Sequence, residues 1–521
     1  MLPERLRWHQ FRPDDPLARV GDSRQVQYVR RYLDDLGAIT ILEEPYYFDK
    51  DYLAEFAAFY CTSAAGYPNV CRRLHFFSQA LDATVLERAL SQDDAAVTVF
   101  RDAYLGFVVI RPIPATPIGR TVLAWYPDRT KTTTPRVVSP SRSYFCHLAG
   151  LSLKVDGLAW QQQDSAVGAC ATIALWSMLH SSALDGHHGL PTTASVTRSA
   201  HRTASLGRRM FPSGGLSIEQ LCEAIKEHGL QPVVVPGDLA GKGPSARPAF
   251  SRERFSASCS ALLRSGFPVL VLGQLRNPGE DESIGGHAIC AVGFRSAPPP
   301  VALPGTVVHH DANIPVVYVH DDNIGPNVRF KVSTDGAGAV FVRPEAPVPI
   351  KPPTLPDPTT TYPEFVPGNL VVAVPEDLRS SPDALHEDGL RMAKLLSTII
   401  AHVGKTIGHP SKAGLTVSSR FSRLRDYLGQ ELSRVIGSGQ PRLGAVRLRL
   451  VEEVPPMSMH VGVIRVGDGA TPLFDVIRDT TDSDQNRRAF AHIVYERALV
   501  PYLDVLRSNF NVDFGHRILA T

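Results

Sequence analysis

The 521-residue sequence lacks several features that would assign it quickly to a class of protein. It has no run of about 18 uncharged apolar residues, so we expect no membrane-spanning helix and no membrane as partner. Its seven cysteines are odd in number and none has CxxC spacing, which excludes a disulfide framework or a zinc ribbon. The N-terminus has no apolar core and carries acidic residues, which excludes a secretion signal. We therefore expect a cytoplasmic protein.

The sequence also lacks an excess of charge of either sign. Its 54 basic residues nearly balance its 52 acidic residues, and the net charge is +2. This balance gives no electrostatic reason to expect nucleic acid as a partner. No internal repeat is visible. Because single hydrophobic cores stop growing near ~250–300 residues, the chain is expected to fold as two or three domains.

Proline clusters and changes of pattern divide the chain into four parts. We predict an N-terminal α+β region of unknown role, a central catalytic region, a proline-rich extended connector, and a C-terminal α+β region that is regulatory or recognises substrate or a regulatory protein. These parts span residues 1–148, 149–343, 344–367 and 368–521. The whole is expected to belong to the α+β class.

Periodicity and residue type predict the elements of each region. The predicted N-terminal helices lie at 25–36 and 52–60, and its strands at 105–112 and 121–126. In the central region, helices at 170–182 and 218–227 precede strands at 231–235, 267–272, 287–294, 316–320, 330–333 and 339–343. After the connector, a strand is predicted at 368–375, with membership of the central sheet as an alternative to the C-terminal region. Further helices are predicted at 383–404, 419–435 and 486–508, and strands at 444–451, 459–466 and 473–478.

Three segments of the central region place reactive side chains at the ends of predicted elements. Cys170 opens an apolar helix, His287 opens a strand, and Asp321 and Asp322 end the next strand. A free thiol has a pKa near ~8.5, and a helix N-terminus with an imidazolium beside it favours the thiolate. A carboxylate on the neighbouring strand can hold the imidazole in one tautomer. The pattern predicts a nucleophile, its base and an orienting acid.

These segments resemble the papain-like cysteine peptidases, and most closely their bacterial C39-like branch. The segments FPVLVLG (267–273) and GHAICAVGF (286–294) follow the strand pair of that branch, and SIEQL (217–221), leading to Gly229, is similar to its intervening helix. The resemblance implies a papain-like core, in which the helix carrying the cysteine packs on an antiparallel sheet carrying the histidine and the acid. It implies cleavage of a peptide or isopeptide bond in a protein or peptide substrate, with no cofactor and no metal.

Two positions near the nucleophile depart from the family pattern. Most members have glycine or tryptophan after the cysteine, where this chain has Ala171. Asp164 stands at the usual spacing of the glutamine that binds the oxyanion, so we assign that role to Gln163, with Gln162 as the alternative. The backbone N–H of Cys170 would be the second oxyanion donor.

The third member of the triad also has alternatives. We prefer Asp321 because it follows the predicted strand directly, whereas Asp322 fits another spacing within the family and Asn323 is a weaker choice. The same triad would serve an acyltransferase, a deamidase or a transglutaminase. A papain fold kept as an inactive recognition module is the alternative outside the enzymes.

Other polar clusters have simpler interpretations. Two histidine clusters have no regular ligand spacing, so we expect loop residues and no metal site. They are His187 with His188, and His309, His310 and Asp311, with His320 and Asp321. A further cluster consists of four arginines on a predicted helical stretch, Arg420, Arg423, Arg425 and Arg434. We interpret these arginines as a solvated face, with a binding patch as the alternative.

Overall fold

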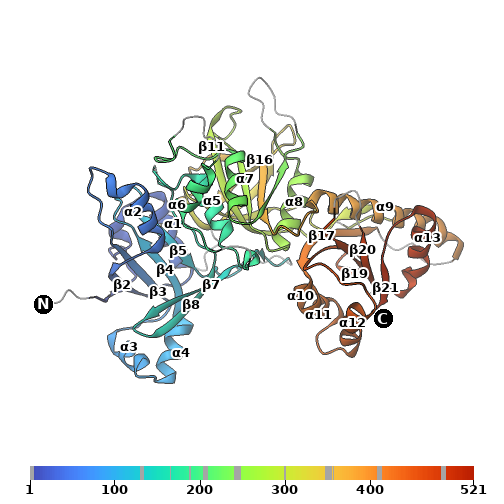
Figure 1. Ribbon diagram of the computed structural model, residues 1–521, viewed down its shortest axis with the longest axis horizontal. Helices are drawn as coiled ribbons and strands as arrows, with labels where there is room; N and C mark the ends of the chain where they lie inside the picture. Colours follow the sequence, from blue (N-terminus) through green and yellow to red (C-terminus); the bar gives the residue numbers. More distant parts are fainter. Residues whose placement is uncertain are drawn as a thin grey trace.

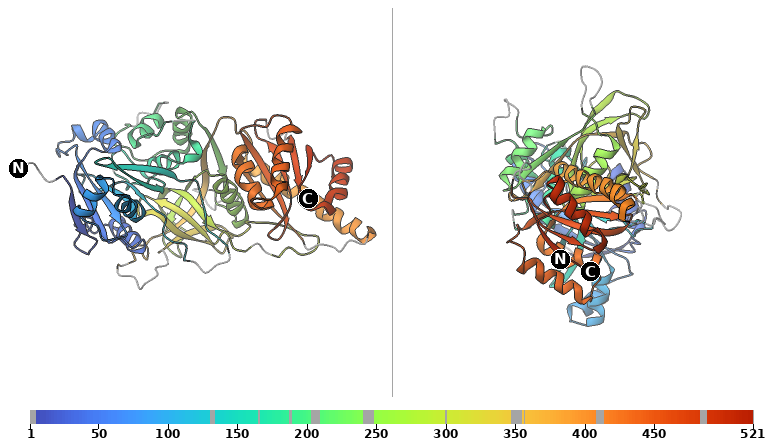
Figure 2. Two further views of the ribbon diagram at one scale, coloured as in Figure 1. Left: turned by 90° about the horizontal axis from the view of Figure 1, so that it is seen from below. Right: turned by 90° about the vertical axis from the view of Figure 1, so that its right-hand side faces the viewer.

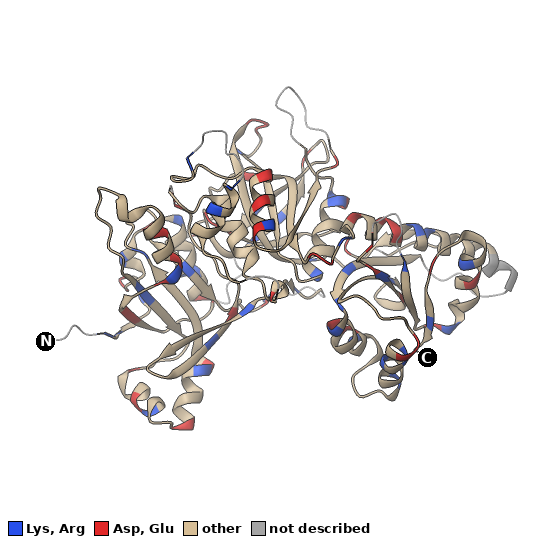
Figure 3. Cartoon of the chain, in the orientation of Figure 1, with Lys and Arg blue, Asp and Glu red and all other residues tan. Residues whose placement is uncertain are grey.

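The computed structural model describes residues 5–129, 134–164, 166–186, 189–202, 209–239, 248–298, 301–346, 355, 357–407, 414–482 and 488–520. His187 and His188, which we expected in a loop, lie outside these described residues. The chain is a mixed α+β protein whose sheets follow one another along a long axis, with the N-terminal region at one end and the C-terminal region at the other (Figures 1 and 2). Charged side chains of both signs are spread over all three regions (Figure 3). Within the described residues, no helix combines the length and apolar content that a membrane span requires.

The N-terminal region is an antiparallel sheet of five strands in sequence order, with helices packed around it. The strands are β1 (Arg7–Gln10), β2 (Thr40–Tyr47), β3 (Cys71–Phe77), β4 (Tyr104–Ile110) and β5 (Ile118–Leu123). The helices are α1 (Arg24–Asp35), α2 (Lys50–Ala58), α3 (Ala83–Leu90) and α4 (Asp94–Ala103). Both predicted helices and both predicted strands are confirmed, with shifts of a few residues at their ends.

A hairpin and a short strand lead from this region into the next. The hairpin consists of β7 (Arg142–Leu148) and β8 (Leu151–Gly157), and β8 contacts β4 and β5 of the first sheet. The short strand β6 (Val137–Val138) pairs with Gly293 and Phe294 of the central sheet. The N-terminal and central regions are therefore joined by backbone hydrogen bonds as well as by side chains.

The central region combines four helices with a sheet that closes on itself. The helices are α5 (Cys170–Leu179), α6 (Thr193–Ala200), α7 (Ile218–Glu227) and α8 (Arg252–Arg264). Six antiparallel strands form a closed barrel in the order β10 (Val269–Arg276), β11 (Ser283–Arg295), β13 (Val316–Asp321), β14 (Gly325–Thr334), β15 (Val340–Glu345) and β16 (Glu364–Val374), because β16 also pairs with β10. Strand β9 (Gln231–Pro236) adds to the outer edge of β16. The two predicted helices, α5 and α7, precede β9 and all the barrel strands as expected, but α6 and α8 were not predicted, and α8 follows β9.

The barrel includes a strand that we expected beyond the connector. Strand β16 begins at Glu364, inside the predicted connector, and it closes the barrel against β10 and β15. The central sheet therefore does not end at residue 343. The prolines predicted an extended segment, but they gave no indication that Phe365 and Leu370 would be buried in the barrel.

The C-terminal region is a six-stranded mixed sheet flanked by helices. Its strands run in the order β12 (Val307–His309), β17 (Leu415–Arg423), β18 (His460–Asp468), β19 (Thr471–Asp479), β20 (Ala489–Val494) and β21 (His516–Leu519). Its helices are α9 (Pro382–Ile407), α10 (Leu424–Asp426), α11 (Leu432–Ile436), α12 (Pro441–Glu452) and α13 (Val500–Phe510), and a π-helical turn, η4 (Tyr427–Glu431), joins α10 to α11. Strand β12 comes from the sequence of the central region and pairs in parallel with β17, so the two regions share a sheet.

Three predictions for the C-terminal region are wrong in part. Residues 444–451 alternate between apolar and polar types, which predicted a strand, but they lie in α12 because Leu443, Val446 and Leu450 form one buried face and Leu448 stays 56% exposed. The predicted helices at 419–435 and 486–508 each begin with a strand, β17 and β20. Both strands are fixed by pairing with sheet neighbours that are distant in sequence, which local periodicity does not report.

The N-terminal region packs directly on the turn that follows β13. A Cβ atom on Gly325 would lie 2.1 Å from a ring carbon of Tyr28, a residue of α1 whose side chain is buried. Gln25 of the same helix donates to the carbonyl of Asp322 at 3.2 Å, and Tyr32 accepts from the amide of Asn327 at 2.9 Å. Helix α1 thus covers the turn that carries the two predicted acids.

This packing predicts the effect of one added methyl group. Gly325→Ala is expected to lower the free energy of unfolding by ~1–3 kcal/mol, because the Tyr28 ring is enclosed and has no room to withdraw. Gly336, in an exposed turn with open space around its Cα, provides the matched control. Gly336→Ala should change the free energy of unfolding by less than ~0.5 kcal/mol. Urea unfolding measures both, and equal effects would contradict the tight contact.

Candidate active site

The predicted nucleophile lies at the start of a buried helix. Cys170 is the first residue of α5, and Ala169 precedes it in an extended conformation without providing a side-chain cap. From Ala171 to Leu179 every side chain is buried, whereas the Cys170 side chain is half-buried. The helix therefore presents a sulfur beside its uncapped N–H groups, where the helix dipole favours negative charge.

His287 is positioned by the barrel. The first four residues of β11 are exposed or half-buried, and the strand becomes fully buried from His287 onward. His287 lies opposite Gly273 of β10, and helix α5 packs against β10, β11 and β13. The start of the helix and the point where β11 enters the core therefore meet.

The two predicted acids reach His287 from the next strand. Asp321 is the last residue of β13, and its Oδ1 lies 3.2 Å from His287 Nε2. The nearest carboxylate oxygen of Asp322 lies 3.7 Å from the same nitrogen. The backbone N–H of Asn323 also donates to Asp321 Oδ1, at 2.9 Å. Asp321 therefore makes the hydrogen bond, and Asp322 is a second, more distant charge.

The thiol and the imidazole are also partners. Cys170 lies close enough to His287 for its side chain to be one of the groups that raise the pKa of the imidazole. Because the Nε2 atom of His287 faces Asp321, Nδ1 is the ring nitrogen left for the sulfur. The structure thus brings together Cys170, His287 and Asp321 from the three segments singled out in the sequence.

Tyr362 is a site residue that the sequence did not reveal. Its hydroxyl donates to Asp321 Oδ2 at 3.0 Å and lies 3.3 Å from His287 Nε2. The side chain is buried, and the guanidinium of Arg24 lies over its ring, 5.2 Å from the centroid. Tyr362 belongs to the proline-rich segment expected to be a connector. No local signal marked this one aromatic residue as part of the site.

Burial and charge act in opposite directions on the site histidine. Burial alone lowers the pKa of His287, but Asp321, with smaller contributions from Cys170 and Asp322, raises that pKa well above its ordinary value. Burial raises the pKa of the Asp322 carboxyl to about 7, against an opposing effect of His287 and with a further rise from Asp321. Burial followed by Asp321 raises the pKa of Tyr362 far above the ordinary value, so its hydroxyl stays a donor.

The predicted oxyanion residues have different surroundings. The amide of Gln163 is half-buried and donates to Asn323 Oδ1 at 2.8 Å, next to the triad. The amide oxygen of Gln162 instead accepts from the backbone N–H of Ile118 at 3.1 Å, in contact with the N-terminal sheet. Of the two glutamines, Gln163 is the one placed beside the acids and open to solvent.

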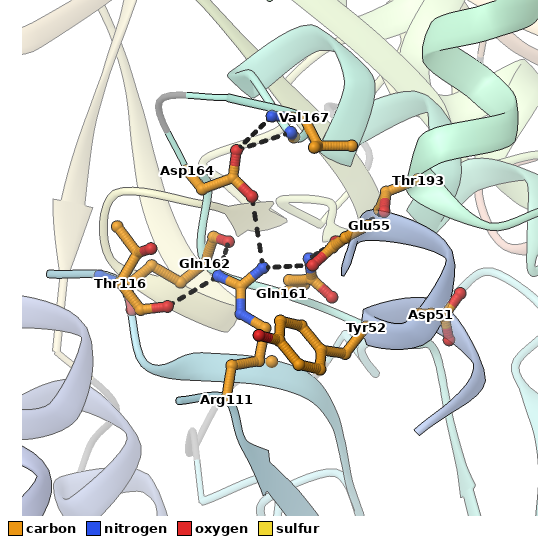
Figure 4. A network of polar contacts seen from close by, with 12 residues as sticks. Asp51, Tyr52, Glu55, Arg111, Thr116, Gln161, Gln162, Asp164, Val167 and Thr193 are labelled. Atoms are coloured by element: carbon orange, nitrogen blue, oxygen red, sulfur yellow. Dashed lines mark hydrogen bonds and ion pairs between the residues drawn. The ribbon is translucent and has the colours of Figure 1, made fainter. Parts of the chain in front are cut away.

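Asp164 organises the loop that leads to the nucleophile. Its Oδ1 accepts from three consecutive backbone N–H groups, those of residues 166–168, at 2.6–2.9 Å (Figure 4). Its Oδ2 lies 3.5 Å from Nη1 of Arg111, and the same nitrogen donates to Glu55 at 3.0 Å. All three charged side chains are buried. Since Arg111 and Glu55 come from the N-terminal region, that region fixes the loop before Cys170.

One set of side chains could also hold a cation. His287, Asp321 and Asp322 offer ligand atoms that all lie within 4.8 Å of one another. Both carboxylate oxygens of Asp322 are buried without a well-formed hydrogen bond within the described part of the chain. One imidazole and two carboxylates form a donor set that divalent transition metals accept. His320 does not join this set, because its Nε2 atom is hydrogen-bonded to the carbonyl of Leu158 at 3.1 Å.

Comparisons with known proteins provide no family for the chain. No protein-family model matches it, and no curated protein matches it either.

The environment of Asp322 predicts a pH-dependent stability. With a pKa of about 7 in the fold and 3.8 as the ordinary value, the folded state keeps a proton that the unfolded state releases between these pH values. Stability from this group therefore falls as pH rises from about 4 to about 7. Asp322→Asn removes this loss, so the variant should gain stability relative to wild type as pH rises. Urea unfolding at pH 5 and pH 8 measures the difference, and a constant difference would contradict the shift.

The Tyr362 hydroxyl predicts a second effect on stability. Tyr362→Phe leaves a buried oxygen of Asp321 without its donor, which is expected to cost ~1–3 kcal/mol of unfolding free energy. Tyr46→Phe is the control, because Tyr46 is 57% exposed, and it should change the unfolding free energy by less than ~0.5 kcal/mol. Equal changes in unfolding free energy for the two variants, measured by urea unfolding, would contradict a role of the Tyr362 hydroxyl in the site.

Proposed function

We propose that the chain is a cysteine peptidase-like hydrolase with a papain-like core, which cleaves a peptide or isopeptide bond through an acyl-enzyme. The observation that carries the proposal is the position of His287 between Cys170 at the start of α5 and Asp321 at the end of β13. A nucleophile, a base beside it and a group that orients the base are the minimum set for nucleophilic catalysis. The packing of α5 against antiparallel strands that carry the histidine and the acid supports the papain-like interpretation.

Each of these residues has a defined role in the proposed reaction. His287 takes the thiol proton at Nδ1, and the sulfur of Cys170 attacks the substrate carbonyl to form a tetrahedral oxyanion. Asp321 holds the ring through Nε2 and stabilises the imidazolium. The backbone N–H of Cys170 and the amide of Gln163, released from Asn323, donate to the oxyanion. His287 then protonates the leaving amine, and water hydrolyses the thioester.

The same intermediate permits other acceptors. An amine acceptor in place of water would make the enzyme an acyltransferase or transglutaminase, and a glutamine side chain as substrate would make it a deamidase. The N- and C-terminal regions would choose the protein or peptide substrate, or bind a regulatory protein. Mass spectrometry of the products separates these reactions, since proteolysis shortens a chain and deamidation does not.

A metal-dependent hydrolase is the second candidate. The close donor set of His287, Asp321 and Asp322 and the poorly bonded oxygens of Asp322 favour it. A cation there would polarise a carbonyl or activate water. In that case Cys170 would be dispensable for turnover.

A thiol-directed probe tests the proposal. At pH 6, an electrophilic peptide probe should label Cys170 at least ~10-fold faster than Cys61, because Cys170 lies beside the base His287, whereas the side chain of Cys61 is exposed and bonds a backbone carbonyl. His287→Ala should reduce labelling of Cys170 to the rate of Cys61. Peptide mass spectrometry measures both sites in one sample, and the exposed Cys61 is the internal control.

Two outcomes would contradict the thiol mechanism. Equal labelling of Cys170 and Cys61 in folded wild-type protein would favour an inactive recognition module. Hydrolysis that survives Cys170→Ala and stops when a chelator is added would instead support the metal-dependent candidate.

A further inference from the structure

A large cavity lies between the central and C-terminal regions. It measures about 1090 Å³. The central region contributes residues 182–183 and 263–267, and the end of the N-terminal region contributes residues 135–138 and 140. The C-terminal region contributes residues from β17, α10, η4, α11 and the β18–β19 turn. Helix α8 packs against β17 beside it. Residues 182–183 follow the C-terminal end of α5, whose ten residues span ~15 Å. The cavity is therefore separate from the site around Cys170, at the opposite end of that helix.

The lining of this cavity is strongly basic. Seven arginines line it, against three acidic residues. Four of them, Arg420, Arg423, Arg425 and Arg434, are the arginines expected to form a solvated helical face. The structure places Arg420 and Arg423 on strand β17, and Arg425 and Arg434 on α10 and α11. The fold brings these four arginines together along the cavity, on the side of the C-terminal region that faces the central region.

Several of these arginines already form ion pairs with acidic side chains of the protein. Arg264 makes two bonds of 2.8 Å to Asp311, and Arg465 makes bonds of 2.6 and 2.7 Å to Asp475. Arg420 pairs with Glu431. These pairs fix the wall of the cavity and orient its basic groups.

Other arginines are left with donors for a ligand. Arg136 is held by stacking over Trp125, with the guanidinium 4.6 Å from the ring centroid, and its buried Nη1 has no hydrogen-bond partner within the described chain. Arg434 is exposed, and no acidic side chain lies within ion-pair distance of it in the described ranges. Arg425 is 74% exposed and has only Asp426, at 3.7 Å.

The positive groups also act on one another. Burial, followed by the charge of Arg465, lowers the pKa of Arg420 to about 10, and Arg264 adds to this effect. A cation whose charged form is disfavoured in this way gains from an anion nearby. The cavity thus combines unused donors with an unbalanced positive potential.

We propose that this cavity binds a small phosphorylated polyanion, held between Arg136, which precedes the strand β6 that pairs with the central sheet, and Arg425 and Arg434 of the C-terminal region. The planar guanidinium fork matches a phosphate group in geometry as well as in charge. The volume suits a ligand of nucleotide size. Since donors come from both sides of the cavity, the ligand would bind the two sides together.

Calorimetry on the full-length protein tests the proposal with two probes, inorganic pyrophosphate and ATP. Wild type is expected to bind at least one of them, and the double variant Arg425→Ser/Arg434→Ser should bind it at least ~10-fold more weakly, because two charge-assisted contacts are lost. Arg497→Ser is the control, since Arg497 is an exposed arginine of the same region outside the cavity, and it should change affinity less than ~2-fold. Binding of ATP but not pyrophosphate would identify a nucleoside phosphate, and binding of both would identify the phosphate groups alone as the ligand.

Three results would overturn the proposal. The first is the absence of binding of both probes at millimolar concentration by folded wild type. The second is binding that the double variant keeps while Arg497→Ser loses it. The third is preference for an acidic peptide, such as oligoglutamate, over both probes, which would make the cavity a docking site for a protein segment.

Discussion

The site depends on one buried pair of opposite charges, His287 and Asp321. Moving two charges out of water costs several kcal/mol per ion, and their attraction offsets this cost only where the remaining atoms are also bonded. Here the Tyr362 hydroxyl and the N–H of Asn323 satisfy Asp321, and burial of the whole set keeps water from competing. The pair is therefore stable only when segments from several parts of the chain are assembled around it.

This requirement makes the N-terminal region part of the site. Helix α1 covers the turn after β13 through Tyr28 and Gln25, and Arg111 holds the loop before Cys170 through Asp164. Arg111 is buried together with its two partners, the carboxyl groups of Glu55 and Asp164, so removing Arg111 would leave two buried carboxyl groups without their cation. The order of the loop at the nucleophile is thus coupled to the folding of the first sheet.

The C-terminal region is connected to the rest in a different way. Strand β12 leaves the central region to pair with β17, and a single hydrophobic core contains residues of all three regions, including Leu17, Val292 and Phe514. A second, separate core lies under α12 and includes Tyr427 and Leu450. The C-terminal region is therefore joined to the central region along one edge of its sheet and has a hydrophobic core of its own away from that edge. The arginine-lined cavity lies at the edge that is joined to the central region.

The sequence by itself determined most of the elements and the chemistry of the site. The start of α5 at Cys170, the limits of α7 and the strands around His287 and Asp321 follow from local rules, because caps, turn residues and apolar runs act within a few residues. The types of residue also predicted a nucleophile, a base and an acid at this site. In the C-terminal region the same rules misassigned α12, β17 and β20, since alternation and helical spacing overlap in short segments.

Only the tertiary structure decided which side chains meet. It selected Asp321 over Asp322 as the hydrogen-bond partner of His287, turned Gln162 away from the site, and brought in Tyr362 from a proline-rich segment. These choices depend on the closure of the barrel by β16 and on packing against α1, which join residues tens to hundreds of positions apart. Such contacts reflect the shape and burial of the whole assembly, and no short stretch of sequence contains that information.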